Sequence, residues 1–177
     1  MPILRSDNRT KTARALKGPL VSLVAVLALM VSVGTLATSC VLTVGSTPIA
    51  SCTSTQGVIV AVDFSQFGRP SERGCDPTTT TGYAALQAAG FVTAGDVQDG
   101  PAFICRIDDL PPPSQDACIK TPPASAFWSY WHANAGTSKW TLSNLGAANY
   151  QPKPGSVDAW AFGSRTPPTF TPAQVRN

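Results

Sequence analysis

The residues best suited to binding or chemistry are aromatic side chains in one short run of the chain. The run FWSYWHA at positions 127–133 places Trp128, Tyr130 and His132 at every second position. In a strand, alternate side chains point to the same face, so these three share one face and Trp131 lies on the other. We assign Trp131 to the core face, and Trp128, Tyr130 and His132 to an exposed binding face. The inverse assignment is the alternative.

Two further tryptophans, Trp140 and Trp160, extend this aromatic set on later predicted strands. Exposed aromatic residues mark binding surfaces for flat or amphipathic partners such as corrins, sugars or peptides. The same side chains would also fill the core of a small domain, which is the alternative role for the set. For His132, metal ligation is an alternative to a place at the surface. The predicted ligand-binding residues are Trp128, Tyr130, His132, Trp140 and Trp160.

Catalytic templates fit this sequence poorly. Nucleophilic hydrolysis needs a Ser or Cys, a His and usually an acid brought together, and His132 is the single histidine of the sequence. The sequence motifs GxSxG, HExxH, GxxxxGK[ST] and GxGxxG are absent. Asp108 and Asp109 are adjacent acids, but neighbours on a strand point to opposite faces. We therefore predict a protein that is not an enzyme, with no cofactor and no catalytic or metal site.

Four cysteines follow Cys40 in the chain. An even number in a small exported domain indicates disulfide bonds, and four cysteines allow three pairings. We favour Cys52–Cys75 and Cys105–Cys118, because each pair closes a local, turn-rich loop. Zinc is the alternative, which the lack of a CxxC pair and the single histidine disfavour.

The positive charge of the chain is concentrated at its N-terminus. The sequence has 13 Lys+Arg against 10 Asp+Glu, a formal net charge of +3. Five basic residues and one acid lie in the first 17 positions, which leaves 8 basic and 9 acidic residues from Cys40 onward. A near-neutral remainder without a Lys/Arg cluster argues against nucleic-acid binding.

An uncharged stretch, Leu20–Ala37, follows the basic segment. This order is typical of a secretory signal, and the stretch is also long enough for a single membrane anchor. Basic residues keep the N-terminal side cytoplasmic, so the rest is predicted to be extracellular or on the outer face of the cytoplasmic membrane. Cleavage near Ala37, lipid modification of Cys40 and retention as an anchor are alternatives for residues 1–40. Contact with the membrane is expected only through this segment.

The exported part is predicted to be α+β, with one helix packed on a mixed sheet. Residues 41–56 are rich in Ser and Thr and are predicted to be a tether, and the Pro-rich residues 164–177 a surface coil. The folded domain is predicted over 57–163. Its expected elements are a strand at 57–65, a connection at 66–81 with a short second strand, a helix at 82–91 capped by 79–81 and Gly90, and strands at 91–93, 100–109, 126–134, 139–146 and 156–163.

Four segments in this order and spacing resemble a known family. They are GYAAL at 82–86, FICRI at 103–107, WSYW at 128–131 and PGSVDAW at 154–160. They are similar to the domain shared by the C-terminal part of transcobalamin and intrinsic factor and by many bacterial exported proteins, the DUF4430 type. The resemblance covers residues 57–163 and implies a β-grasp-like fold.

This resemblance also implies ligand binding outside the cell, since cobalamin is the ligand of the animal members. In those proteins the domain caps a helical barrel that supplies much of the corrinoid contact, so a lone domain is expected to bind weakly or to need a partner. We predict an exported or membrane-attached, non-enzymatic module for cobalamin or a related corrinoid. The alternative is a cell-surface structural or interaction domain that binds a cell-envelope protein through the same aromatic face.

Overall fold

The computed structural model describes residues 47–78 and 80–177. The predictions for residues 1–40, including lipidation of Cys40, and for the first part of the tether concern residues outside these ranges. Within the described ranges, no helix is both long enough and apolar enough to cross a membrane.

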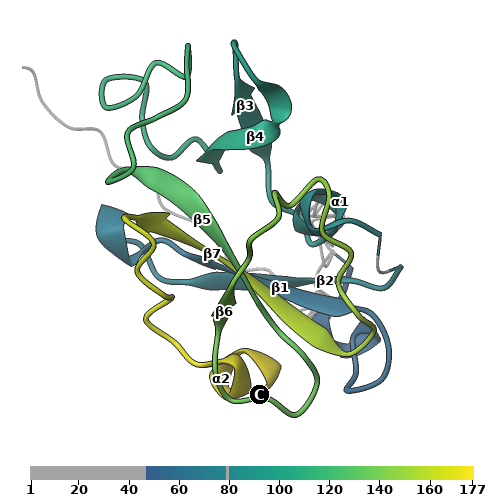
Figure 1. Cartoon of the computed structure of the whole chain (residues 1–177). Coiled ribbons are helices and arrows are strands. Elements are labelled where there is room, and N and C mark those ends of the chain that lie inside the picture. The colour runs from purple at the N-terminus through teal and green to yellow at the C-terminus, as the bar shows by residue number, and fades with distance from the viewer. Residues whose placement is uncertain (1–46, 79) are drawn as a thin grey trace, which may run out of the picture. The chain divides into compact units, whose positions relative to one another are not determined.

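The described chain is α+β, as predicted (Figure 1). Its strands are β1 (Val58–Asp63), β2 (Glu72–Asp76), β3 (Thr93–Asp96), β4 (Gly100–Ile107), β5 (Phe127–Ala133), β6 (Thr141–Leu142) and β7 (Ser156–Gly163). Its helices are α1 (Gly82–Ala88) and the short α2 (Pro172–Arg176), with single 3-10 turns η1 (Ile49–Ser51) and η2 (Ser65–Phe67).

Five strands form one mixed sheet in the order β2-β1-β7-β5-β6. β1 and β2 form an antiparallel hairpin, and β1 pairs in parallel with β7. β5 is antiparallel to both β7 and β6. A hairpin, a helix on one face and a last long strand parallel to the first make this arrangement β-grasp-like, so the predicted fold class is confirmed. β3 and β4 pair with each other in a separate two-stranded sheet.

Helix α1 forms where the sequence predicts it. The side chain of Thr81 accepts a hydrogen bond from the backbone N–H of Ala84 at 3.2 Å, which caps the first turn. Gly90 follows the helix with φ 100°, a conformation that favours glycine. Gly74 of β2 brings the helix close, because a Cβ there would stand 2.0 Å from the carbonyl oxygen of Ala89. The helix therefore packs directly on the sheet.

Both faces of the central sheet are buried. We call the face toward α1 the helix face and the opposite one the tail face. The helix face carries the larger core cluster, which includes Val58, Val60, Val62, Ala85, Leu86, Trp128, Tyr130 and Trp160. The tail face carries mainly small or branched side chains, namely Ile59, Ala61, Val157, Ala159 and Ala161, together with Trp131.

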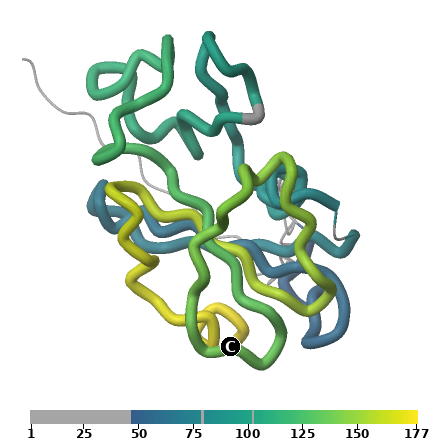
Figure 2. The backbone as a smooth tube through the Cα atoms, viewed as in Figure 1, coloured from purple at the N-terminus to yellow at the C-terminus, as the bar shows by residue number. Residues whose placement is uncertain are grey.

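Residues 164–171 form a mostly exposed coil as predicted, but 172–176 form α2 and the segment covers the tail face. Figure 2 follows the chain from the end of β7 back along the sheet to α2. Phe170 and Val175 pack against the tail face, and Asp63 accepts hydrogen bonds from the backbone N–H and the hydroxyl of Thr169 at 2.6 and 2.8 Å. The tail becomes part of the domain because a strand with apolar side chains on both faces needs cover on both.

Both predicted disulfides are present. Cys52–Cys75 and Cys105–Cys118 each have a Cα–Cα distance of 5.8 Å. The first bond and the packing of Ile49 against the tail face show that the folded domain begins before residue 57, so the tether is shorter than predicted. Two such bonds indicate a domain that matures in an oxidising environment.

Candidate functional site

A hollow of about 410 Å³ lies on the helix face, between β5, β7 and the loop that follows β6. Its volume falls within the range of roughly 300–1,000 Å³ that is common for small-molecule sites. Aromatic and aliphatic side chains predominate in the lining. The lining residues are Phe103, Ile104, Phe127, Trp128, Ser129, Tyr130, Leu142, Ser143, Asn144, Leu145, Gly146, Ala147, Trp160 and Arg165.

Three rings, those of Trp128, Tyr130 and Trp160, form the floor of this hollow. The indole N–H of Trp128 donates to the carbonyl of Leu110 at 3.0 Å, and the hydroxyl of Tyr130 donates to the carboxylate of Asp158. The ring centroids of Tyr130 and Trp160 are 5.0 Å apart. The floor is thus held in place by hydrogen bonds and ring contacts and is suited to present a fixed surface to a ligand.

The outer wall is the segment from Leu142 to Ala147, and the loop continues to Tyr150. The backbone N–H of Ser143 donates to the carbonyl of Tyr130 at 2.9 Å, which starts the loop at the edge of β5. The first N–H groups of α1 have no partner within the helix. Those of Gly82 and Tyr83 donate to the carbonyls of Tyr150 and Ala147 at 2.9 and 3.1 Å. The loop is therefore tied to both the sheet and the helix.

The predicted exposure of Trp128 and Tyr130 is wrong, because these side chains are only 5% and 6% exposed. Trp131, assigned to the core, is buried on the tail face as predicted. Alternation correctly separates the two sets, but α1 and the Leu142–Tyr150 loop cover the helix face. What remains open to a ligand is the rim of the hollow above the floor rings.

The structure does not bring His132 and Trp140 into the hollow. The half-buried His132 ring stacks on Tyr150, with centroids 4.4 Å apart, and burial lowers the pKa of its imidazole. Trp140 lies with the tail-face residues, where its indole N–H donates to the carbonyl of Phe170 at 2.7 Å. Of the five predicted ligand-binding residues, the hollow contains Trp128, Tyr130 and Trp160.

A buried acid behind the floor was not singled out from the sequence. Asp158 is fully buried and accepts a hydrogen bond from the hydroxyl of Tyr130. Burial raises the pKa of Asp158 to about 7; the carboxylate of Asp76 also raises this pKa, whereas the bond from Tyr130 lowers it. Burial, followed by the charge of Asp158, raises the pKa of Tyr130. The alternation of β7 does place Asp158 on the same face as Trp160, which was the available signal.

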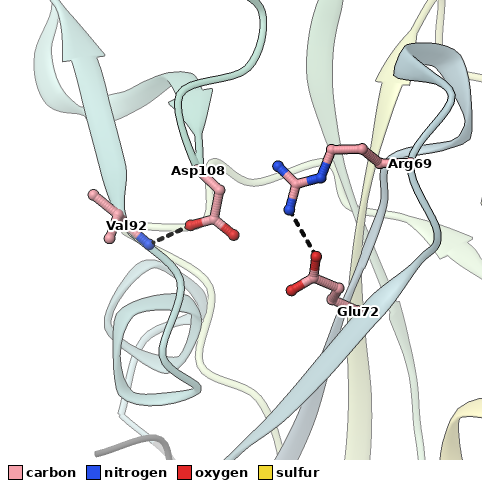
Figure 3. A network of polar contacts seen from close by, with 4 residues as sticks. All are labelled: Arg69, Glu72, Val92 and Asp108. Atoms are coloured by element: carbon pink, nitrogen blue, oxygen red, sulfur yellow. Dashed lines mark hydrogen bonds and ion pairs between the residues drawn. The ribbon is translucent and has the colours of Figure 1, made fainter. Parts of the chain in front are cut away.

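The adjacent acids Asp108 and Asp109 have a structural role. They follow β4 with φ values of 48° and 64° and form the two-residue turn between Ile107 and Leu110. The carboxylate of Asp108 accepts a hydrogen bond from the backbone N–H of Val92 at 2.8 Å. Figure 3 shows this bond beside the ion pair of Arg69 with Glu72, whose N–O distance is 2.7 Å. Asp108 thus joins the end of β4 to the residue that precedes β3.

The thiols that could have bound zinc are oxidised. The sulfurs of Cys105 and Cys118 and a carboxylate oxygen of Asp116 lie within 4.8 Å of one another. The disulfide joins the two sulfurs, so neither is a free thiolate, and the Asp116 carboxylate accepts from the backbone N–H of Cys118 at 2.7 Å. This cluster therefore closes a loop and does not form a metal site.

No protein-family model matches this sequence, and no curated protein matches it. The fold and the hollow are therefore the features that indicate a function. Rings on the floor, small polar groups on the wall and one guanidinium at the rim suit the non-covalent binding of a small amphipathic molecule.

Proposed function

We propose that this chain is a non-enzymatic ligand-binding module that works outside the cytoplasm. Its ligand is a small amphipathic molecule, with cobalamin or a related corrinoid as the first candidate. The observation that carries this proposal is the hollow of about 410 Å³ floored by Trp128, Tyr130 and Trp160. The three rings are only 3%, 5% and 6% exposed, so a ligand would touch their open edges together with the wall of the hollow. Because the rings are already ordered, this contact costs little further conformational entropy.

The β-grasp-like topology and the two disulfides support the choice of ligand and of compartment. They agree with the fold and the exported location implied by the resemblance to the transcobalamin-type domain. A corrinoid would place one edge of its flat macrocycle on the floor rings and extend beyond the hollow. A partner protein of the cell envelope would then supply the remaining contacts.

The chemistry of the lining supports binding rather than catalysis. Among the described residues that line the hollow there is no histidine, cysteine or carboxylate. The nearest titratable pair, Tyr130 and Asp158, is buried, and its two members are hydrogen-bonded to each other. Such a lining holds neither an activated nucleophile nor an accessible general base.

Calorimetric titration of the whole chain with cyanocobalamin and with cobinamide tests this proposal. We expect micromolar binding that Leu145→Asp weakens, because Leu145 is 50% exposed on the wall of the hollow. Val97→Asp is the matched control, since Val97 is 80% exposed and lies outside the hollow. Absence of heat at high micromolar corrinoid would overturn the corrinoid assignment. Equal affinities of the two variants would overturn the hollow as the site.

A second candidate function, protein interaction at the cell surface, is favoured by a separate apolar pair. Val97 and Ile119 are 80% and 64% exposed, and the backbone N–H of Val97 donates to the carbonyl of Cys118 at 2.9 Å, which places the two residues near each other. Contiguous exposed apolar side chains can form an interaction surface, and these two side chains would be its centre. Capture of an envelope protein that Val97→Asp abolishes and Leu145→Asp does not would support this function.

A further inference from the structure

We propose that the ligand of the hollow is an organic anion, whose flat apolar part lies on the floor rings and whose acidic group is bound by Arg165. This inference rests on the proposed function and deepens it by naming the chemical class of the ligand. Among corrinoids it favours cobalamin, which carries an anionic phosphodiester, over cobinamide, which lacks that group. It starts from the charge of the lining rather than from its apolar part.

Arg165 is the one charged residue among those that line the hollow. Its side chain is exposed, and neither an Asp nor a Glu shares the lining. A positive charge beside apolar rings, with no carboxylate to compensate it, attracts an anion and repels a cation. The floor rings and the guanidinium together match a molecule with one apolar part and one acidic group.

Other described arginines are engaged within the fold. Arg69 pairs with Glu72 at 2.7 Å, Arg106 donates to the carbonyl of Pro111 at 2.9 Å, and Arg176 donates to the carbonyl of Asn134 at 2.9 Å. Arg165 makes no hydrogen bond or ion pair with any residue of the described chain. Its five N–H donors remain available, and their planar fork matches two oxygens of a carboxylate, sulfonate or phosphate.

The backbone at Arg165 adds an independent observation. The chain leaves β7 through Gly163, with φ 135°, and turns back at Arg165, with φ 63°. A left-handed conformation is unfavourable for a residue with a Cβ, and glycine would adopt it without strain. The turn holds the base of the Arg165 side chain at the rim of the hollow.

A pair of dyes that differ only in one anionic group tests the inference on the whole chain. The probes are 1-anilinonaphthalene-8-sulfonate, an aromatic anion, and N-phenyl-1-naphthylamine, which lacks the sulfonate. We expect the anion to bind about tenfold more tightly, the effect of one charge-assisted hydrogen bond. Arg165→Gln should remove this preference, so that the two dyes bind to this variant with equal affinity. Lys120→Gln removes a cation outside the hollow and should leave the preference intact.

The outcomes separate this inference from the proposed function. If both dyes bind and Leu145→Asp weakens both, but the anion has no advantage or keeps it in Arg165→Gln, the role of Arg165 is overturned and the hollow stands as a site. If neither dye binds, or Leu145→Asp weakens neither, the hollow is not a ligand site and the proposed function fails as well. Circular dichroism of each variant confirms that the fold is retained.

Discussion

The helix face and the tail face of the central sheet are both buried, but different side chains build them. The helix face carries Trp128, Tyr130 and Trp160, and the loop above them leaves a hollow of about 410 Å³. The tail face carries alanines on β1 and β7, and the hollow between its cover and the sheet edge measures about 220 Å³. Of these two hollows, the one on the helix face is the larger and has the more aromatic lining, so it is the better place for a ligand.

The two faces also differ in the pKa of a buried aspartate, Asp63 on the tail face and Asp158 on the helix face. Asp63, at the end of β1, receives hydrogen bonds from Ser65 at 3.0 Å and from Thr169 at 2.6 and 2.8 Å. Burial alone would raise the pKa of Asp63, but these bonds outweigh it and hold the pKa below its usual range. Among the described residues, Asp158 accepts a side-chain hydrogen bond from Tyr130 alone, so burial prevails and raises the pKa of Asp158 to about 7. The tail thus supplies hydrogen bonds that stabilise the charged form of Asp63, whereas the single bond from Tyr130 does not offset the burial of Asp158.

The largest expected effect is that of Trp160→Ala on the helix face. Removing a fully buried tryptophan costs about 3–5 kcal/mol of unfolding free energy, since it leaves a cavity among rings that cannot close in. Trp140→Ala on the tail side is the matched variant. It should cost clearly less, because Trp140 is only half-buried. Urea unfolding followed by circular dichroism measures both. Equal losses would contradict the difference between the faces.

Asp158→Asn should change how stability depends on pH. With a folded pKa above the unfolded value, Asp158 takes up a proton on folding between pH 4 and 7, so its contribution to stability falls as pH rises through that window. The variant lacks this titration and should match the wild type near pH 4. At pH 8 it should be more stable by an amount on the order of a few kcal/mol. If the variant and the wild type differ in stability by the same amount at pH 4 and pH 8, the pKa of Asp158 is not raised in the folded protein.

Asp63→Asn should show the opposite sign on the tail face. A depressed folded pKa stabilises the native state above the ordinary pKa of an aspartate, and this contribution is lost as pH falls through it. The wild type should therefore lose stability on acidification below about pH 4, and the variant should lose less. At pH 7 the variant should be less stable by roughly 1–3 kcal/mol, because donors that served a carboxylate lose a partner. Thermal unfolding at pH 3 and pH 7 decides the sign.

The smallest expected effect is that of Thr171→Ala at the start of α2. Thr171 caps this short helix in a reciprocal arrangement with Gln174, whose side chain accepts from the backbone N–H of Thr171 at 2.7 Å. Loss of an N-cap costs about 1 kcal/mol. Thr81→Ala removes the corresponding cap of α1 and serves as the comparison on the helix face. Limited proteolysis after residue 163 should be faster in Thr171→Ala and not in Thr81→Ala.

The sequence predicts the longer elements well, because their signals are local. The strand predicted at 91–93 lies instead at Thr93–Asp96, and the one predicted at 139–146 is only Thr141–Leu142. Thr81 and Gly90 bracket α1, alternation marks β5 and β7, and short loops between cysteines favour the two bonds that form. The hollow was predicted only in part. Trp128, Tyr130 and Trp160 have the strong signal of size and alternation. Arg165 and Leu145 carry no sequence signal that predicts their place at the hollow, since each lies in a loop whose position depends on packing.

The sequence by itself determined which side chains share a face of each strand, where the helix begins and which cysteines are close enough to pair. Only the tertiary structure decided which faces are covered, because cover comes from residues far along the chain. The turn at Arg165 sends residues 164–177 back over β1 and β7, and the loop from Leu142 to Tyr150 folds over β5. The lowered pKa of Asp63 follows from the first of these contacts and the wall of the hollow from the second. Trp128 is covered by Phe64 and Phe67, which also lie far from it in the sequence.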